Sequence, residues 1–202
     1  QLADLCGASF TGINSKTLIS QLILDSRKAK HFNEHLFIAL KGPHYDGHDF
    51  IKNLYLKGCR NFLISSPNFN ASDFPEGNFL ITSDSLLGFQ KIAQNHRNKF
   101  EIPVIGITGS NGKTIVKEWL SSCLQKNYKT YKSPKSYNSQ VGVSLSILGL
   151  NPKDEIGVFE AGISEKNEMI KLKNIIQPTI GIFTNIGQAH SENFISLQEK
   201  TK

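Results

Sequence analysis

Short apolar runs separated by turn-forming residues cover the first half of the chain. Four such runs predict buried strands, at residues 22–24, 36–40, 61–65 and 78–82. Residues 84–100 instead carry apolar side chains at helical spacing, with Asp84 or Ser85 in the N-cap position. The stretch 67–77 is rich in Pro, Asn and Ser, which predicts a surface loop. We therefore expect a small α/β domain over residues 1–100.

From residue 101 the pattern becomes a regular alternation of strands and helices. Strands are predicted at residues 104–108, 156–159 and 179–184, and helices at 114–126 and 165–176. The first of these helices is expected to have one apolar face, made of Ile115, Val116, Trp119, Leu120, Cys123 and Leu124. Such an alternation is typical of a parallel sheet. The expected fold is α/β, with a parallel-sheet domain at 101–202 that is incomplete at its C-terminus.

Composition narrows the class of protein. The chain has 202 residues, 39% of them hydrophobic, and its apolar runs are far shorter than the roughly 20 residues of a membrane span, so we expect no membrane insertion. The net charge of +6 comes from scattered basic residues, which does not favour a nucleic-acid partner. Three cysteines without C-x-x-C spacing argue against a disulfide framework and favour the cytoplasm. Because the chain starts at Gln1 and its only methionine is Met169, we expect a processed or excised piece.

The strongest chemical signal lies between the strand at 104–108 and the helix that follows. It reads Gly106-Ile107-Thr108-Gly109-Ser110-Asn111-Gly112-Lys113-Thr114. Glycines allow consecutive backbone N–H groups to converge on anionic oxygens, and the helix N-terminus adds a positive dipole. Lys113 can reach the β- and γ-phosphates, and the Thr114 hydroxyl can bind Mg²⁺. The strict phosphate-loop pattern would need glycine at Ile107, so a tight turn with an incidental lysine is the alternative.

Polar residues follow two later strands, where ligands of open α/β sheets bind. Glu160 comes directly after the strand at 156–159 and could serve a metal or a water molecule. His190 comes shortly after the strand at 179–184, and its imidazole could bind a second metal. A solvent-exposed acid and an ordinary surface or packed histidine are the alternatives. Asn138 fits a helix cap as well as a site residue.

Taken together, these motifs resemble the Mur ligase family. Four motifs of this chain resemble those of the family's ATP-binding central domain: Gly109-x-x-Gly-Lys-Thr114, Tyr137-Asn138 before 141–143, Glu160-Ala-Gly162 and Asn185-Ile-Gly-x-Ala-His190. Its substrate-nucleotide domain is similar in Asp25-Ser26-Arg27, in residues 36–42 and in Asp46-Gly47-His48. The motifs cover nearly the whole chain in the order of the family.

The resemblance implies an ATP-dependent amide-bond ligase of peptidoglycan precursor synthesis that works through an acyl phosphate. It implies catalytic roles for Lys113, Asn138, Glu160 and His190, and Mg²⁺ binding by Thr114, Glu160 and His190. The ATP-binding residues would be Thr108, Gly109, Ser110, Asn111, Gly112, Lys113, Thr114 and Ile115. The UDP part of the substrate would contact Ser26, Arg27, Asp46, Gly47 and His48. A strand end and a turn leading into a helix at 50–57 are the alternatives for this last set.

Within the family, the stretch 160–165 with Glu168-Met169 resembles the member that joins D-alanyl-D-alanine to UDP-N-acetylmuramoyl-tripeptide. Residues 117–119 and 133–140 are similar to a form fused to an alanine racemase. The carbamoylated lysine of the family would fall beyond Lys202, and its third domain is missing, so we expect weak nucleotide binding and little turnover. Four alternatives stay open: the ligase that adds the third amino acid to the UDP-muramoyl dipeptide, a folate polyglutamylating ligase, a P-loop ATPase or kinase, and a nucleotide-binding module without catalysis.

Overall fold

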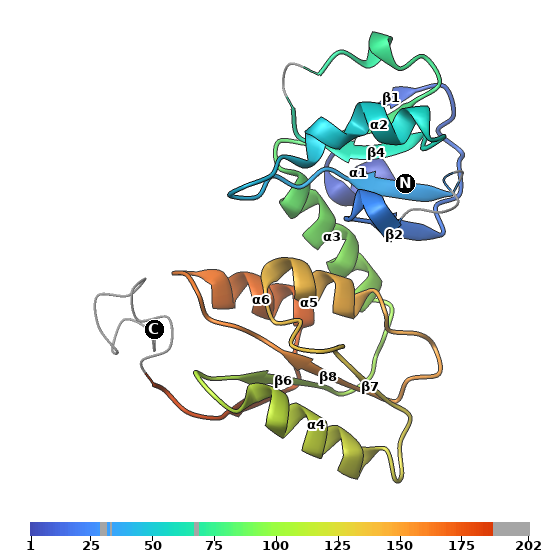
Figure 1. Ribbon diagram of the computed structural model, residues 1–202. Coiled ribbons are helices and arrows are strands. Elements are labelled where there is room, and N and C mark those ends of the chain that lie inside the picture. Colours follow the sequence, from blue (N-terminus) through green and yellow to red (C-terminus); the bar gives the residue numbers. More distant parts are fainter. Residues whose placement is uncertain (29–31, 33, 67–68, 188–202) are drawn as a thin grey trace. The chain divides into compact units, whose positions relative to one another are not determined.

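The protein is described by a computed structural model at residues 1–28, 32, 34–66 and 69–187. The chain divides into two compact units, Gln1–Ile92 and Ala93–Lys202. The division falls inside helix α3 (Ser85–Arg97), which Figure 1 shows in green. The sequence analysis keeps this whole helix in the first domain, whereas in the structure Ala93 belongs to the buried core of the second unit. Asp84 caps the helix as expected, because its Oδ1 accepts hydrogen bonds from the Leu86 and Leu87 amides.

The first unit is built on a five-stranded sheet with the order β1-β5-β4-β3-β2. Its strands are β1 (Ser9–Gly12), β2 (Gln21–Ile23), β3 (His35–Ile38), β4 (Asn61–Ile64) and β5 (Asn78–Ile81). Strands β2 to β5 are parallel, and β1 pairs antiparallel with β5 at one edge. Its other elements are α1 (Leu2–Cys6), α2 (Ile51–Leu56) and short 3₁₀ turns at Ser26–Lys28, Gly47–Phe50 and Ala71–Asp73. The four predicted strands are present with small shifts at their ends, while β1 and α1 are additions.

Aromatic packing dominates the core of the first unit. The rings of Phe62 and Phe79 are stacked with centroids 5.1 Å apart, and Phe69 packs on Phe79 at 4.6 Å. Phe74 also contacts Phe79 and stacks on Phe69. The stretch 67–77 is therefore more than the surface loop that its composition predicts, because its two phenylalanines cover the buried rings of the sheet.

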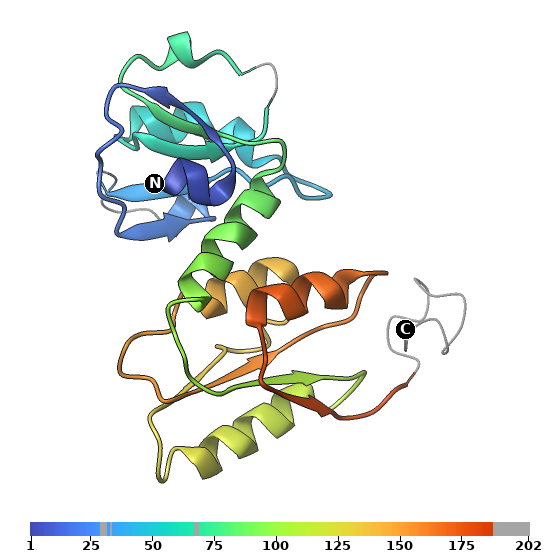
Figure 2. The same cartoon turned by 180° about the vertical axis from the view of Figure 1, so that it is seen from behind.

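The second unit is a three-layered parallel α/β structure. Its sheet has the order β7-β8-β6-β9, with β6 (Val104–Thr108), β7 (Thr130–Lys132), β8 (Ile156–Glu160) and β9 (Ile180–Phe183) all parallel. Helix α4 (Lys113–Leu124) lies on one face, and α5 (Gln140–Ile147) and α6 (Glu168–Ile176) lie on the other (Figures 1 and 2). The pairing sets Ile107 opposite Glu160 and Thr108 opposite Phe183, so the carboxyl ends of three adjacent strands meet at one edge.

Each face of this sheet has its own core. Val143, Ile147, Phe159, Leu172 and Ile175 are among the residues that pack on the side of α5 and α6. On the other side, Ile105, Ile107 and Val158 meet Val116, Leu120 and Leu124 of α4.

The expected apolar face of α4 is partly wrong. Ile115, Cys123 and Trp119 point to solvent, with Trp119 72% exposed, whereas Lys117 and Ser121 are buried. The six apolar positions span too wide an arc for one contact. The sheet covers the side of the helix with Val116, Leu120 and Leu124, and the buried side continues past them to Lys117 and Ser121.

Two further features bear on the expectations from composition. Within the described residues, no helix has the length and apolar character that crossing a bilayer requires. Cys6, Cys59 and Cys123 are free thiols, the first two of them buried. The fold class is α/β with parallel sheets, as predicted.

Candidate functional site

The glycine-rich loop joins the carboxyl end of β6 to the N-terminus of α4. Gly109 and Gly112 have φ values of +134° and +80°, which L side chains rarely adopt. Gly112 is the N-cap residue of α4, whose first amides lack acceptors inside the helix and point toward the loop. Ile107 departs from the strict motif at a buried strand position in the sheet core, before the loop begins. The loop therefore has the backbone geometry of an anion site.

The segment after β9 holds the loop in place. The Ser110 amide donates to the Asn185 carbonyl at 2.9 Å, and the Asn111 amide donates to Asn185 Oδ1 at 3.0 Å. The Thr184 hydroxyl donates to the Asn111 carbonyl at 2.6 Å. The sequence analysis lists Asn185 only as part of a motif, and the structure shows that it shapes the phosphate loop. His190, a few residues further on, lies outside the described residues.

Lys113, the first residue of α4, turns back over the loop. Its Nζ donates to the Gly109 carbonyl at 2.6 Å and to the Ser110 carbonyl at 3.4 Å. Its positive charge therefore lies over the glycine-rich turn, where bound phosphate groups would need it.

Thr114 and Glu160 are brought together from α4 and the end of β8. The Thr114 hydroxyl donates to Glu160 Oε2 at 3.1 Å and lies 3.3 Å from the Ser136 hydroxyl. Glu160 is fully buried, so the alternative of a solvent-exposed acid is wrong. Two residues that the sequence analysis proposes as Mg²⁺ ligands thus occupy one site beside the loop.

Lys117 is a further residue of this site, and it is not among the site residues predicted from the sequence. It is completely buried, and its Nζ lies 3.0 Å from Glu160 Oε1. The same Nζ donates to the carbonyls of Ser133, at 2.9 Å, and of Lys135. One signal for it was present, because Lys117 lies between Val116 and Leu120 and one helical turn after Lys113, on the part of α4 that starts at the loop.

These residues fit a magnesium ion. Glu160 Oε1 is buried, and apart from the Lys117 ammonium at 3.0 Å it has no hydrogen-bond partner in the part of the chain that the structure describes. Mg²⁺ prefers oxygen ligands and is commonly bound by one or two carboxylates together with substrate phosphates. Among the described residues no group of three His, Cys, Asp or Glu forms a metal cluster. Thr114 and Glu160 would accordingly supply the protein ligands, and the nucleotide would supply others.

Asn138 lies beside the end of β8. Its carbonyl accepts a hydrogen bond from the Gly162 amide at 2.8 Å. The cap of α5 is the next residue, Ser139, whose hydroxyl accepts from the Gly142 amide at 3.2 Å. The helix-cap alternative for Asn138 is therefore wrong, and the residue stays a candidate for the site.

In the first unit, Ser26 and Arg27 begin the 3₁₀ turn that follows β2. The Arg27 guanidinium donates through Nε and Nη2 to the two carboxylate oxygens of Asp25, each at 2.9 Å. This hydrogen-bonded pair raises the pKa of Arg27 above its ordinary value. The Arg27 side chain is 87% exposed, so its fork is presented at the surface of the unit.

Asp46, Gly47 and His48 form a tight turn at the carboxyl side of β3. A Cβ on Gly47 would lie 2.7 Å from the Leu40 backbone nitrogen, so only glycine fits there. His48 Nδ1 lies 2.5 Å from Asp46 Oδ1, and its Nε2 accepts from the Ser65 amide at 3.0 Å. The His48 amide also donates to Asp46 Oδ1 and lowers the pKa of that carboxyl. Both ring nitrogens of His48 are thus engaged in holding the turn.

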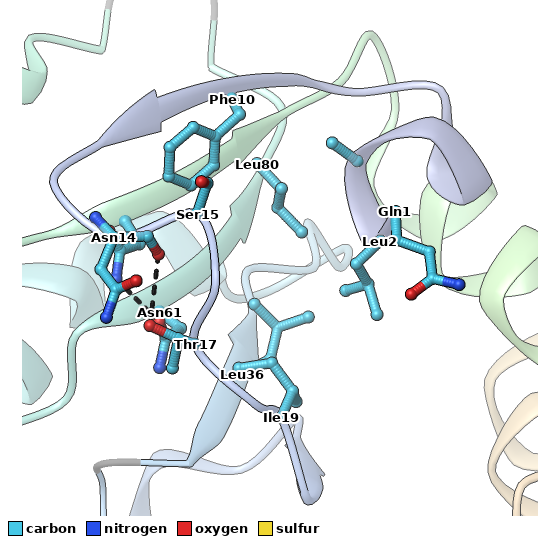
Figure 3. A pocket seen from close by; sticks show the side chains of 12 residues that line it. Gln1, Leu2, Phe10, Asn14, Ser15, Thr17, Ile19, Leu36, Asn61 and Leu80 are labelled. Atoms are coloured by element: carbon cyan, nitrogen blue, oxygen red, sulfur yellow. Dashed lines mark hydrogen bonds between the residues drawn. The ribbon is translucent and has the colours of Figure 1, made fainter.

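A separate cavity of about 170 Å³ opens in the first unit (Figure 3). Leu36, Asn61 and Asn78, which line it, lie toward the amino ends of β3, β4 and β5, opposite to the end that carries Ser26 and Asp46. Asn78 Nδ2 donates to Asn61 Oδ1 at 3.0 Å, and Asn61 Nδ2 donates to the His35 carbonyl at 3.2 Å. None of the predicted substrate residues lines this cavity.

Comparison with known proteins shows which family has this fold and this glycine-rich loop. The Mur ligase middle domain matches residues 107–201. A UDP-N-acetylmuramoyl-tripeptide–D-alanyl-D-alanine ligase of Borreliella burgdorferi is 40% identical over 200 residues, covering 94% of this chain and 43% of that protein.

Solved structures agree with this relationship. A crystal structure of MurF from Acinetobacter baumannii superposes with a TM-score of 0.88 at 28% identity, covering 98% of this chain and 43% of that one. MurF ligase from Thermotoga maritima, solved in complex with ADP, gives a TM-score of 0.80 at 29% identity, covering 93% and 42%. The chain spans less than half the length of these relatives. It belongs to the Mur ligase family, and its residues 107–201 correspond to the middle domain of that family.

Proposed function

We propose that the protein acts as an ATP-dependent amide-bond ligase that joins D-alanyl-D-alanine to UDP-N-acetylmuramoyl-tripeptide in peptidoglycan precursor synthesis. The observation that carries the proposal is the 3.1 Å contact between Thr114 Oγ1 and the buried Glu160 Oε2 beside the glycine-rich loop. It combines a phosphate-binding turn with a carboxylate and a hydroxyl suited to Mg²⁺. The pair of substrates comes from the names of the relatives.

In this reaction the γ-phosphate of ATP is transferred to the substrate carboxylate with release of ADP, and the amine of D-alanyl-D-alanine then attacks the acyl phosphate and displaces phosphate to form the amide. The amides of Ser110 and Asn111 are held by Asn185, so the other amides of residues 109–114 bind the phosphates, and the Lys113 ammonium offsets the charge that develops on them. Thr114 and Glu160, with His190, hold Mg²⁺, which neutralises charge on the transferring group when bound. Asn138 lies next to the end of β8 and contributes a polar group close to the reacting carboxylate.

The first unit binds the nucleotide part of the muramoyl substrate in this proposal. Arg27 presents a planar guanidinium suited to phosphate oxygens, and the Asp46 turn supplies a rigid neighbouring edge. Asp25 accepts from Nε and Nη2 and so orients the guanidinium, which leaves the N–H groups of Nη1 for phosphate oxygens. A cytoplasmic location follows, because ATP is the phosphoryl donor and the cysteines are free thiols.

The test is an ADP-release assay on the full-length protein, with the muramoyl tripeptide and D-alanyl-D-alanine omitted in turn. We expect sustained ADP release, over many turnovers, only when both are present. A matched reaction with UDP-muramoyl dipeptide and a diamino acid tests the ligase that adds the third residue, and we expect background release there. ADP release that needs neither substrate would contradict the proposal and favour a plain ATPase.

A further inference from the structure

Lys117 is a fully buried charge at the meeting point of three segments. Its Nζ donates to the carbonyls of Ser133 and Lys135, and it lies 3.0 Å from Glu160 Oε1 and 3.3 Å from Glu118 Oε1. Glu118 is partly exposed and also pairs with Lys132 at the surface, whereas Glu160 is as completely buried as Lys117.

The number of protons on the ammonium limits what it can do. An ammonium group has three N–H donors, and two of them serve the carbonyls of Ser133 and Lys135. Glu160 Oε1 lies 3.0 Å from this ammonium, within reach of its third N–H, and has no other hydrogen-bond partner in the described part of the chain. The third N–H of Lys117 is thus the one that can serve Glu160 Oε1, and a further lone pair of that oxygen is left for another cation.

The same ammonium also orders the segment between β7 and α5. Ser133 and Lys135 lead directly to Ser136, whose hydroxyl lies 3.3 Å from that of Thr114, and to Asn138. A buried ion pair rarely adds net stability over apolar side chains of the same size, so stability alone gives no reason for a lysine at this position. Its contacts instead link the proposed metal ligands of α4 and β8 to the segment that carries Asn138.

We propose that Lys117 is a positioning residue, which orients Glu160 toward the cation of a bound nucleotide and fixes residues 133–138 beside it. The inference rests on the proposed function only through the Mg²⁺-nucleotide site. Lys117 touches neither nucleotide nor metal in this proposal, and it acts through Glu160 and the two carbonyls.

The experiment measures the affinity of the full-length protein for ADP by calorimetry, in EDTA and in excess Mg²⁺. We expect Lys117→Met to change ADP affinity in EDTA by less than about threefold, since the phosphate loop is untouched, and to remove most of the Mg²⁺ enhancement. Lys132→Met is the matched control, because Lys132 shares the Glu118 contact but not Glu160, and we expect it to keep the full enhancement. Equal losses in EDTA and in Mg²⁺ would show a merely structural role and overturn the inference.

A second comparison keeps the test valid should Lys117→Met fail to fold. Glu160→Gln and the double variant Lys117→Met/Glu160→Gln leave no unpaired buried carboxylate. We expect the two variants to have the same affinity for ADP as each other, both in EDTA and in excess Mg²⁺. A further loss in the double variant that is equal in EDTA and in Mg²⁺ would overturn the inference, because Lys117 would then affect the nucleotide independently of the cation. A wild type without any Mg²⁺ enhancement would overturn the metal site itself, whereas an enhancement that survives Lys117→Met would overturn only the role of Lys117.

Discussion

Gly109 and Thr184 approach so closely that a Cβ at position 109 would lie 2.1 Å from the Thr184 hydroxyl oxygen. The backbone of Asn185 would lie within 3.0 Å of the same atom. The loop after β6 and the segment after β9 are thus packed against each other at the edge of the sheet where the candidate site lies. The glycine is required by this contact as well as by its positive φ.

We expect Gly109→Ala to lower the free energy of unfolding by about 2–4 kcal/mol, from overpacking and from the positive φ. Urea denaturation measures the change. Gly112→Ala is the control, because Gly112 also has a positive φ but no neighbouring atom within 4 Å of the added Cβ. We expect it to lose only about 1 kcal/mol. Equal losses for the two variants would contradict the importance of the contact with Thr184.

Removing the Thr114 hydroxyl tests the proposed Mg²⁺ ligand. Thr114→Val keeps the shape of the side chain but cannot donate to Glu160 or bind a cation, so we expect ATP-dependent ligation to fall on the order of 10²-fold. The measurement is kcat/KM for ADP release in the full-length protein. Thr114→Ser retains the hydroxyl and should stay within about fivefold of the wild type. Full activity in the valine variant would remove Thr114 from the site.

The buried Lys117–Glu160 pair is expected to affect the free energy of unfolding. Lys117→Met leaves a buried carboxylate without its counter-ion, and we expect a loss of about 3–5 kcal/mol in the free energy of unfolding. Lys117→Met/Glu160→Gln removes both charges and should recover most of that loss. Chemical denaturation of the two variants beside the wild type provides the comparison. A double variant as unstable as the single one would mean that packing, not charge, is what Lys117 contributes.

Tyr131, on β7, is expected to make the stability of the second unit depend on pH in alkaline solution. Burial, and secondarily the charge of Asp154, raises the pKa of Tyr131 from 10.0 to about 12. Because the folded state holds the phenol neutral, this stabilisation is complete below pH 10 and is lost as the pH rises toward 12.

We expect about 1–2 kcal/mol of unfolding free energy to disappear across that interval, since the partial exposure of the ring reduces the linkage. Tyr131→Phe should lack this component in denaturation curves measured at several pH values. A variant that loses stability in alkali as steeply as the wild type would exclude Tyr131 as the source.

Local pattern predicted most elements, because a buried strand or an amphipathic helix shows its period within a few residues. The strand at 104–108 has the predicted bounds, and β8 differs only by including Glu160. By contrast, β1 has no buried residue and consists of Ser9, Phe10, Thr11 and Gly12. It is a strand because it pairs with the edge of β5, and the local sequence has no apolar period that would predict this pairing.

In the candidate site, too, some residues could be predicted from the sequence and others could not. Thr114 and Glu160 could be predicted because the ends of parallel strands meet at one edge, whatever the details of packing. The role of Lys117 could not, since a lysine on a helix is ordinarily a solvent-exposed residue. His48 stays a predicted substrate residue, and only the structure shows that its two ring nitrogens are engaged with Asp46 and with the Ser65 amide.

By itself, the sequence determined the order of strands and helices, the glycine-rich turn ahead of a helix, and the polar residues that end the strands, because each of these depends on neighbours along the chain. Only the tertiary structure decided which side of α4 is buried, that Thr184 and Asn185 hold the loop, and that Lys117 meets Glu160. Those contacts join segments distant in sequence. Their geometry depends on the order of the strands in the sheet and on the need of the buried Lys117 charge for an opposite charge beside it.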